Sequence, residues 1–152
     1  RMYTLVRRFI KTSILFLATG LVIGGWMIAR RELYGLLPDP YVMSAHTHAL
    51  FVGFVVMMIE GVALWLFPRP EKGDERYQPR TIEWAYWMLT VATAVRIAGE
   101  LARASSSAAW LRVLVLIAAF AQIGGILLFF YTMWTRIRSA GSRLREASGE
   151  RF

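Results

Sequence analysis

The feature that most constrains this chain is a series of long apolar runs, because an α-helix needs about 20 apolar residues to cross a bilayer. Four such runs occur among the 152 residues, at about 12–29, 45–67, 81–101 and 108–134. Backbone groups left unpaired in hydrocarbon cost several kcal/mol each, so apolar runs of this length form helices. The sequence therefore predicts an all-α fold, an integral membrane four-helix bundle that forms one domain over residues 1–135.

Composition and the connections between the runs support this prediction. Hydrophobic residues make up 57% of the chain and the mean hydropathy is +0.45, which is high for a soluble domain of this size. Proline and clustered serine are typical of turns and loops. Such residues separate the runs, at Pro38-Asp39-Pro40, Pro68-Arg69-Pro70 and Ser105-Ser106-Ser107.

The distribution of lysine and arginine predicts the orientation in the membrane. With four spans, both termini and the second connection lie on one side, and 13 of the 18 basic residues fall there. Because basic loops are retained in the cytoplasm, both termini are expected to be cytoplasmic, in a multi-pass protein of the cell inner membrane. Residues 136–152 then form a basic cytoplasmic tail that is solvated or bound to lipid.

Charge and cysteine content exclude several classes of function. The net charge is +8, but the basic residues lie in short stretches between apolar runs, so no nucleic-acid partner is expected. The chain has no cysteine, which excludes disulfides, iron–sulfur clusters and thioether-attached haem. Neither a G-x-G-x-x-G nor a G-K-[ST] pattern occurs, so nucleotide binding has no support.

Two histidines, His46 and His48, are the most informative polar residues, since they lie one to two turns into the second span from its outer side. An ionisable side chain at this depth is costly unless it is paired, lines a cavity or binds something. Residues two apart on a helix point about 200° away from each other, so the two imidazoles cannot bind one metal centre. Either the histidines bind a cofactor, or each forms a hydrogen bond with a neighbouring helix.

The stretch Ala45-His46-Thr47-His48, with Pro68-Arg69 twenty residues after His48, resembles the haem-binding tenth helix of the catalytic subunit of haem-copper oxidases and nitric-oxide reductases. It also resembles the short four-helix relatives of that subunit. The resemblance implies that the imidazoles of His46 and His48 bind the iron of haem b, at a high-spin and a low-spin haem respectively. The copper site of that family needs three further histidines, which this chain does not have. Reduction of dioxygen at a haem-copper centre is therefore not expected.

A six-coordinate haem needs a second histidine that one chain cannot supply, because His46 and His48 face apart. The resemblance implies a homotrimer, since the catalytic subunit of that family has three similar arcs of four helices. The haem would then lie between copies, bound by His48 of one chain and His46 of the next. A dimer with one haem on its axis is the simpler alternative. A monomer would leave the haem five-coordinate or use a methionine such as Met57, Met58 or Met88.

Charged residues inside the third span form a second candidate group. Arg96, Glu100 and Arg103 follow at spacings of four and three, so they share one face of a helix at about the depth of the histidines. Arg96 and Arg103 are predicted to neutralise haem propionates, a role suited to the guanidinium group. An Arg96–Glu100 salt bridge that lowers the cost of insertion is the alternative. Arg30 and Arg31 are interpreted as interface anchors.

Glu60 lies in the inner half of the second span, where an ionised carboxylate costs roughly 2.5 to 3.5 kcal/mol. We expect it to stay protonated and to form a hydrogen bond across an oligomer interface. A role in proton transfer or in contact with a quinone is the alternative. The Gly24-Gly25 and Gly124-Gly125 pairs are expected to permit close contact between helices.

Three functions are compatible with these residues. The first is a membrane haem-binding protein that transfers electrons or binds nitric oxide or dioxygen. The second is a structural subunit of a respiratory or photosynthetic complex that binds no cofactor. The third, a transporter, is disfavoured because the sequence shows neither an inverted repeat nor a broken span. No catalytic residue is predicted.

Overall fold

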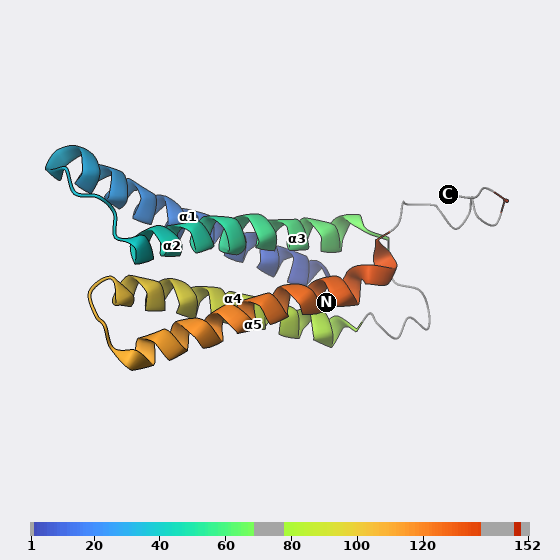
Figure 1. The fold of residues 1–152 in the computed structure, drawn as a ribbon. Coiled ribbons are helices and arrows are strands. Elements are labelled where there is room, and N and C mark those ends of the chain that lie inside the picture. Colours follow the sequence, from blue (N-terminus) through green and yellow to red (C-terminus); the bar gives the residue numbers. More distant parts are fainter. Residues whose placement is uncertain (1, 69–77, 138–147, 150–152) are drawn as a thin grey trace.

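Four helical rods make up the fold (Figure 1). The computed structural model describes residues 2–68, 78–137 and 148–149, and within these ranges the chain forms helices and turns but no strand. The prediction of an all-α fold with four helices is confirmed. Three rods are single helices, α1 (Met2–Tyr34), α4 (Pro79–Arg103) and α5 (Ala109–Met133), and a short 3-10 helix η2 (Trp134–Arg136) continues α5.

The second rod is one continuous helix made of three parts, α2 (Pro40–His48), the π-helix η1 (Ala49–Val56) and α3 (Met57–Leu66). A π-helix forms i→i+5 hydrogen bonds, is rare, and frequently marks a functional site. Gly53 lies in η1, and a Cβ added there would lie 2.6 Å from Cγ of Phe16. The wide turn thus coincides with a close approach of α1, which apolar periodicity alone does not predict.

Successive rods run in opposite directions, so the bundle has two distinct ends (Figure 1). At the terminal end, α1 begins, α3 ends, α4 begins and α5 ends. At the turn end, residues 35–39 connect α1 to α2 and residues 104–108 connect α4 to α5. The turn-end part of α1 diverges from α4 and α5 in this view.

Contacts between the rods depend on small residues that let backbones approach closely. A Cβ added to Gly61 of α3 would lie 2.9 Å from Cβ of Phe9 in α1. A Cβ added to Gly125 of α5 would lie 3.1 Å from the backbone nitrogen of Leu89 in α4. The prediction that a Gly124-Gly125 pair permits close helix contact is therefore confirmed at Gly125. These contacts place α1 beside the second rod and α5 beside α4.

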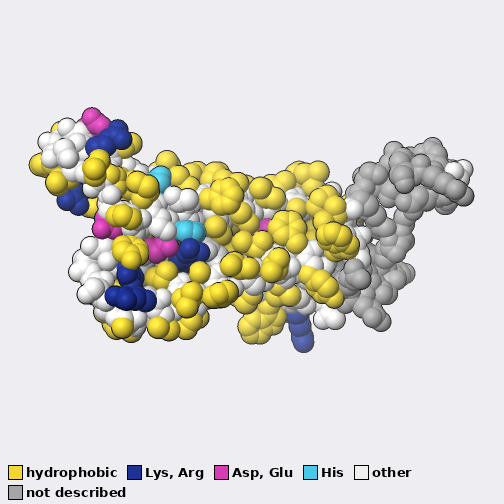
Figure 2. Space-filling model, in the orientation of Figure 1, with side chains coloured by type: hydrophobic (Ala, Val, Ile, Leu, Met, Phe, Trp, Pro, Cys, Tyr) yellow, Lys and Arg dark blue, Asp and Glu magenta, His cyan; other side chains and the backbone are white. Residues whose placement is uncertain are grey.

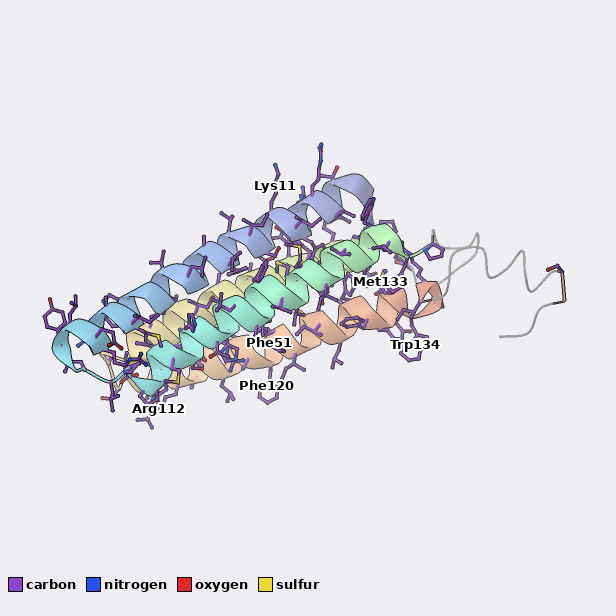
Figure 3. The ribbon with its side chains drawn as sticks, turned by 90° about the horizontal axis from the view of Figure 1, so that it is seen from above. Lys11, Phe51, Arg112, Phe120, Met133 and Trp134 are labelled. Atoms are coloured by element: carbon purple, nitrogen blue, oxygen red, sulfur yellow. The ribbon has the colours of Figure 1, made fainter. Side chains whose placement is uncertain are left out.

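The outer surface of the bundle is largely apolar, as Figure 2 shows in yellow for one face. Phe120 of α5 and Trp134 of η2 point away from the bundle (Figure 3) and are exposed. Three helical stretches are long and apolar enough to cross a membrane, at Thr4–Tyr34, Pro40–Leu66 and Ala109–Arg136. Long apolar helices with exposed apolar side chains indicate a membrane protein, because a soluble protein would cover such a surface.

Helix α4 has the length of a span but is less apolar than the other three rods, since it carries Arg96 and Glu100 in its second half. Of its polar side chains, Thr93 and Glu100 are buried against neighbouring helices, whereas that of Glu83 is about half exposed. The exposed face of α4 is apolar and includes Trp84 and Val91.

A buried arginine joins the last turn of the fourth rod to the end of α3. The guanidinium group of Arg136 is 1% exposed and donates hydrogen bonds to the carbonyl oxygens of Leu64 at 3.1 Å, Phe67 at 2.9 Å and Pro68 at 2.8 Å. Carbonyls at the C-terminal end of a helix lack partners within the helix. The sequence placed Arg136 at the start of a solvated or lipid-bound tail, and that interpretation is wrong for this residue because Arg136 caps α3.

Candidate functional site

The start of α2 fixes the position of the two histidines. Asp39 caps the helix, since its side chain accepts a hydrogen bond of 2.8 Å from the backbone nitrogen of Tyr41. Pro40 occupies the first turn, where a missing N–H costs nothing. His46 and His48 therefore lie in the last turn of a well-defined helix, directly before the π-helix η1.

His46 faces α1, at a place where Gly24 leaves room for its ring. Its Nδ1 lies 2.8 Å from the carbonyl oxygen of Gly20. Because a carbonyl oxygen only accepts, Nδ1 carries the proton, and Nε2 keeps the lone pair that binds a metal. Beside the ring is an outward-facing apolar groove of about 440 Å³, lined by residues that include Leu21, His46, Leu50 and Phe51.

Gly24 is predicted to be essential for this placement of His46. A Cβ added to Gly24 would lie 2.7 Å from Cε1 of His46, whereas a Cβ added to Gly25 would meet nothing within 4 Å. We expect Gly24→Ala to displace the ring and to lower the free energy of unfolding in detergent by about 1 kcal/mol, roughly the value of one hydrogen bond. Gly25→Ala is the matched control and should stabilise the helix by roughly 0.5 to 1 kcal/mol. Equal shifts in the two variants would contradict this role of Gly24.

His48 faces α4, so the two imidazoles lie against different helices, as their spacing predicts. Its Nδ1 lies 2.8 Å from the carbonyl oxygen of Ser44 and 3.4 Å from Oε2 of Glu100. The hydroxyl of Ser44 donates to Oε1 of Glu100 at 2.9 Å. Nδ1 of His48 is thus also a donor, and Nε2 again keeps its lone pair.

Arg96 and Glu100 belong to a polar network that links α2, α4 and α5. Nε of Arg96 donates to Oε1 of Glu100 at 3.1 Å, which forms the salt bridge that was the alternative to propionate binding. A terminal nitrogen of Arg96 donates to Oε1 of Gln122 at 2.9 Å, and Nε2 of Gln122 donates to the hydroxyl of Thr93 at 2.9 Å. The depth predicted for Arg96 and Glu100 is confirmed by the contact of Glu100 with His48.

Two residues in this region differ from expectation. Gln122 was not among the predicted site residues, although a lone amide in the most apolar run of the chain was an available signal. Arg103 lies apart from the Glu100 network, because it donates to the hydroxyl of Tyr41 at 2.6 Å and stacks over the Tyr41 ring at 4.6 Å. At this end of the bundle, imidazole lies beside acidic and basic side chains (Figure 2).

The comparisons with known proteins add nothing to this geometry. No protein-family model, curated protein or solved structure matches this chain. The resemblance of the His46-Thr47-His48 stretch to the haem-copper oxidase subunit therefore stays a prediction from its motif. Within the described ranges, no three His, Cys, Asp or Glu side chains are grouped in a way that would hold a metal ion.

The histidines nevertheless fit an axial role toward haem, which takes only one or two protein ligands. In both residues a backbone carbonyl holds Nδ1, and such an outer hydrogen bond fixes the tautomer and orientation of a metal-binding imidazole. The arginines fit a propionate less well, because Arg96 is bound to Glu100 and Gln122 and Arg103 to Tyr41. A propionate would have to compete with these partners.

Proposed function

We propose that the protein is a membrane haem-binding protein that transfers electrons or binds nitric oxide or dioxygen. The observation that supports this best is the environment of His46. Its Nδ1–H is fixed by Gly20, and its ring borders an apolar groove on the outside of the bundle. An oriented imidazole next to an open apolar groove is suited to a large flat cofactor shared with a neighbouring chain.

The residues of this chain would perform distinct tasks in such a protein. His46 and His48 would bind iron through Nε2, while the carbonyls of Gly20 and Ser44 keep the rings in place. Glu100 would strengthen His48 as a ligand through its negative charge, since its Oε2 lies 3.4 Å from Nδ1. Bound haem would supply the one-electron or gas-binding chemistry.

Membrane topology is part of the same proposal. The exposed face of α4 is apolar and its polar face is covered by α2 and α5, so α4 is suited to be the fourth span. The excess of basic residues favours cytoplasmic termini in a cell inner membrane. His46 and His48 would then lie in the outer half of the bilayer, toward the turn end.

Association of copies would complete the coordination of the haem. Because His46 faces α1 and His48 faces α4, one chain offers a single ligand on each side. In a homotrimer, His48 of one copy and His46 of the next would bind one haem, so both histidines of every chain would be used. In a dimer, only one histidine of each copy would bind the haem. Spectroscopy distinguishes these arrangements, since they depend on different histidines.

The test is the absorption spectrum of protein purified in detergent after expression with added haem, both oxidised and dithionite-reduced. For shared bis-histidine haem, we expect sharp reduced α and β bands that are lost in His46→Ala and in His48→Ala. Loss in only one variant would indicate a five-coordinate haem or a dimer. Met43→Ala, on the same helix but exposed and outside the lining of the groove, is the matched control and should keep the spectrum. Absence of a Soret band from the wild-type protein would overturn the proposal.

A cofactor-free structural subunit of a respiratory or photosynthetic complex is the second candidate. It is favoured by the fact that both imidazoles already have hydrogen-bond partners within the chain, at Gly20 and Ser44. It predicts a colourless protein in which the histidines serve only to hold helices together.

A further inference from the structure

Glu60 of α3 is a buried acid that the proposed haem function does not use. Its side chain is 1% exposed, and neither carboxyl oxygen has a hydrogen-bond partner among the described residues. The expectation that Glu60 bonds across an oligomer interface is therefore wrong, because the side chain is covered by its own chain. An intramembrane acid of this kind marks a functional site more often than a structural one.

Among the described basic residues at this end of the bundle, Arg8 and Arg136 are bound to other groups than Glu60. Arg8 forms its ion pair with Glu83 at 2.7 Å, and Arg136 is bound to the backbone carbonyls at the end of α3. An ionised carboxylate that is buried without a partner is strongly disfavoured. The neutral acid, which carries a proton, is thus the stable form of Glu60.

Glu60 lies at the depth of residues 9–13 of α1. The next residue, Gly61, packs against Phe9, since a Cβ there would lie 2.9 Å from Cβ of Phe9. Two residues earlier, Sδ of Met58 lies 3.8 Å from the hydroxyl of Ser13. Phe9 in turn contacts the ring of Tyr86 in α4, with centroids 5.1 Å apart.

Two polar contacts join α1 to α4 between the depth of Glu60 and the terminal end. The hydroxyls of Thr12 and Tyr86 lie 2.8 Å apart, and the Arg8–Glu83 pair lies one turn nearer the end, four residues earlier on α1 and three earlier on α4. The side chains of Arg8 and Glu83 are 42% and 46% exposed. They line a hollow of about 360 Å³, large enough for several water molecules.

We propose that Glu60 is an intramembrane proton-binding site that exchanges its proton with water at the terminal end through Tyr86 and Thr12. The Glu60 carboxyl has no hydrogen-bond partner among the described residues, so it releases its proton to a water molecule that enters between it and Tyr86, and it becomes a carboxylate. Each hydroxyl on the way accepts one proton and passes on another, so neither changes its net charge. The return of a proton by the same route restores the acid. The site is independent of haem and of the histidines.

Labelling with a hydrophobic carbodiimide tests the protonated state, because such reagents react with neutral acids in apolar surroundings. We expect mass spectrometry of the wild-type protein in detergent to find the adduct on the peptide that contains Glu60. Glu60→Gln should abolish this adduct, and Glu32→Gln, which changes an exposed acid at the turn end, should leave it. An unlabelled Glu60 peptide would overturn the proposal. The wild-type result alone decides this point if Glu60→Gln fails to fold.

Infrared spectroscopy tests the route. The carbonyl stretch of a neutral Glu60 shifts when its proton is exchanged for deuterium after transfer into heavy water, and Glu60→Gln identifies the band. We expect the double variant Thr12→Val, Tyr86→Phe to slow this exchange about tenfold, which corresponds to roughly 1.4 kcal/mol in the barrier. The matched control is Thr19→Val, Tyr34→Phe, in which both residues are exposed. Exchange that is equally fast in both double variants would overturn the route.

Discussion

Replacement of Arg136 by alanine should lower the free energy of unfolding by about 3 kcal/mol, one of the two largest effects that the structure predicts. The variant removes three hydrogen bonds from a charged group and leaves the carbonyls of Leu64 and Phe67 buried without those donors. It also removes the contact that fixes the end of α5 to the end of α3. Unfolding of the detergent-solubilised protein by titration with sodium dodecyl sulfate measures the change.

Two further variants separate the geometry of Arg136 from its charge. Arg136→Lys keeps the charge but loses the planar fork that reaches three carbonyls at once, so it should recover less than half of the loss. Arg112→Ala removes an exposed arginine at the turn end of α5 and should change stability by no more than about 0.5 kcal/mol. Full stability of Arg136→Lys would show that only the charge matters.

The second large effect is expected for Glu100→Leu, again about 3 kcal/mol, because it leaves the largely buried Arg96 without its carboxylate. Ser44 and His48 lose a partner in the same variant. The double variant Arg96→Leu, Glu100→Leu replaces both charges by apolar groups and should recover most of the loss. A double variant as unstable as the single one would contradict this explanation.

An exposed ion pair provides the control for Glu100. Glu83→Leu breaks the Arg8–Glu83 pair, whose side chains are about half exposed, so its effect on stability should lie below about 1 kcal/mol. Both acids are on α4 and both are paired with an arginine. A difference between Glu83→Leu and Glu100→Leu therefore reports burial rather than the type of residue.

The sequence correctly predicted those features of the fold that depend on residues close together in the chain. Apolar runs near 45–67 and 108–134 became the second and fourth rods, although the second rod begins at Pro40, five residues before the predicted start. The helical period predicted that His46 and His48 would face different neighbours and that Arg96 would reach Glu100. The Arg96–Glu100 contact lies within one helix, and the directions of the His46 and His48 side chains follow from the geometry of one helix.

The features that the sequence did not predict depend on contacts between distant parts of the chain. Arg136 donates hydrogen bonds to carbonyl groups that lie 68 to 72 residues earlier in the chain. Without this packing of α5 against α3, the same arginine would be solvated. The π-helix coincides with the approach of Phe16 to Gly53, a contact that residues 49–56 alone do not specify. Glu60 was expected at a surface between copies because its position on the helix does not reveal which neighbours cover it.

The polar face of α4 has a consequence for biosynthesis. The translocon tests each segment for its own preference for lipid, and the charged Arg96 and Glu100 in the second half of α4 count against its insertion. In the arrangement that we propose, Ser44 and His48 are made before α4, but Gln122 is made after it. Stable insertion of α4 then requires the synthesis of α5, so the two helices should enter the membrane together as a hairpin. A nascent chain on a ribosome stalled before Gln122 should therefore have its third span outside the membrane.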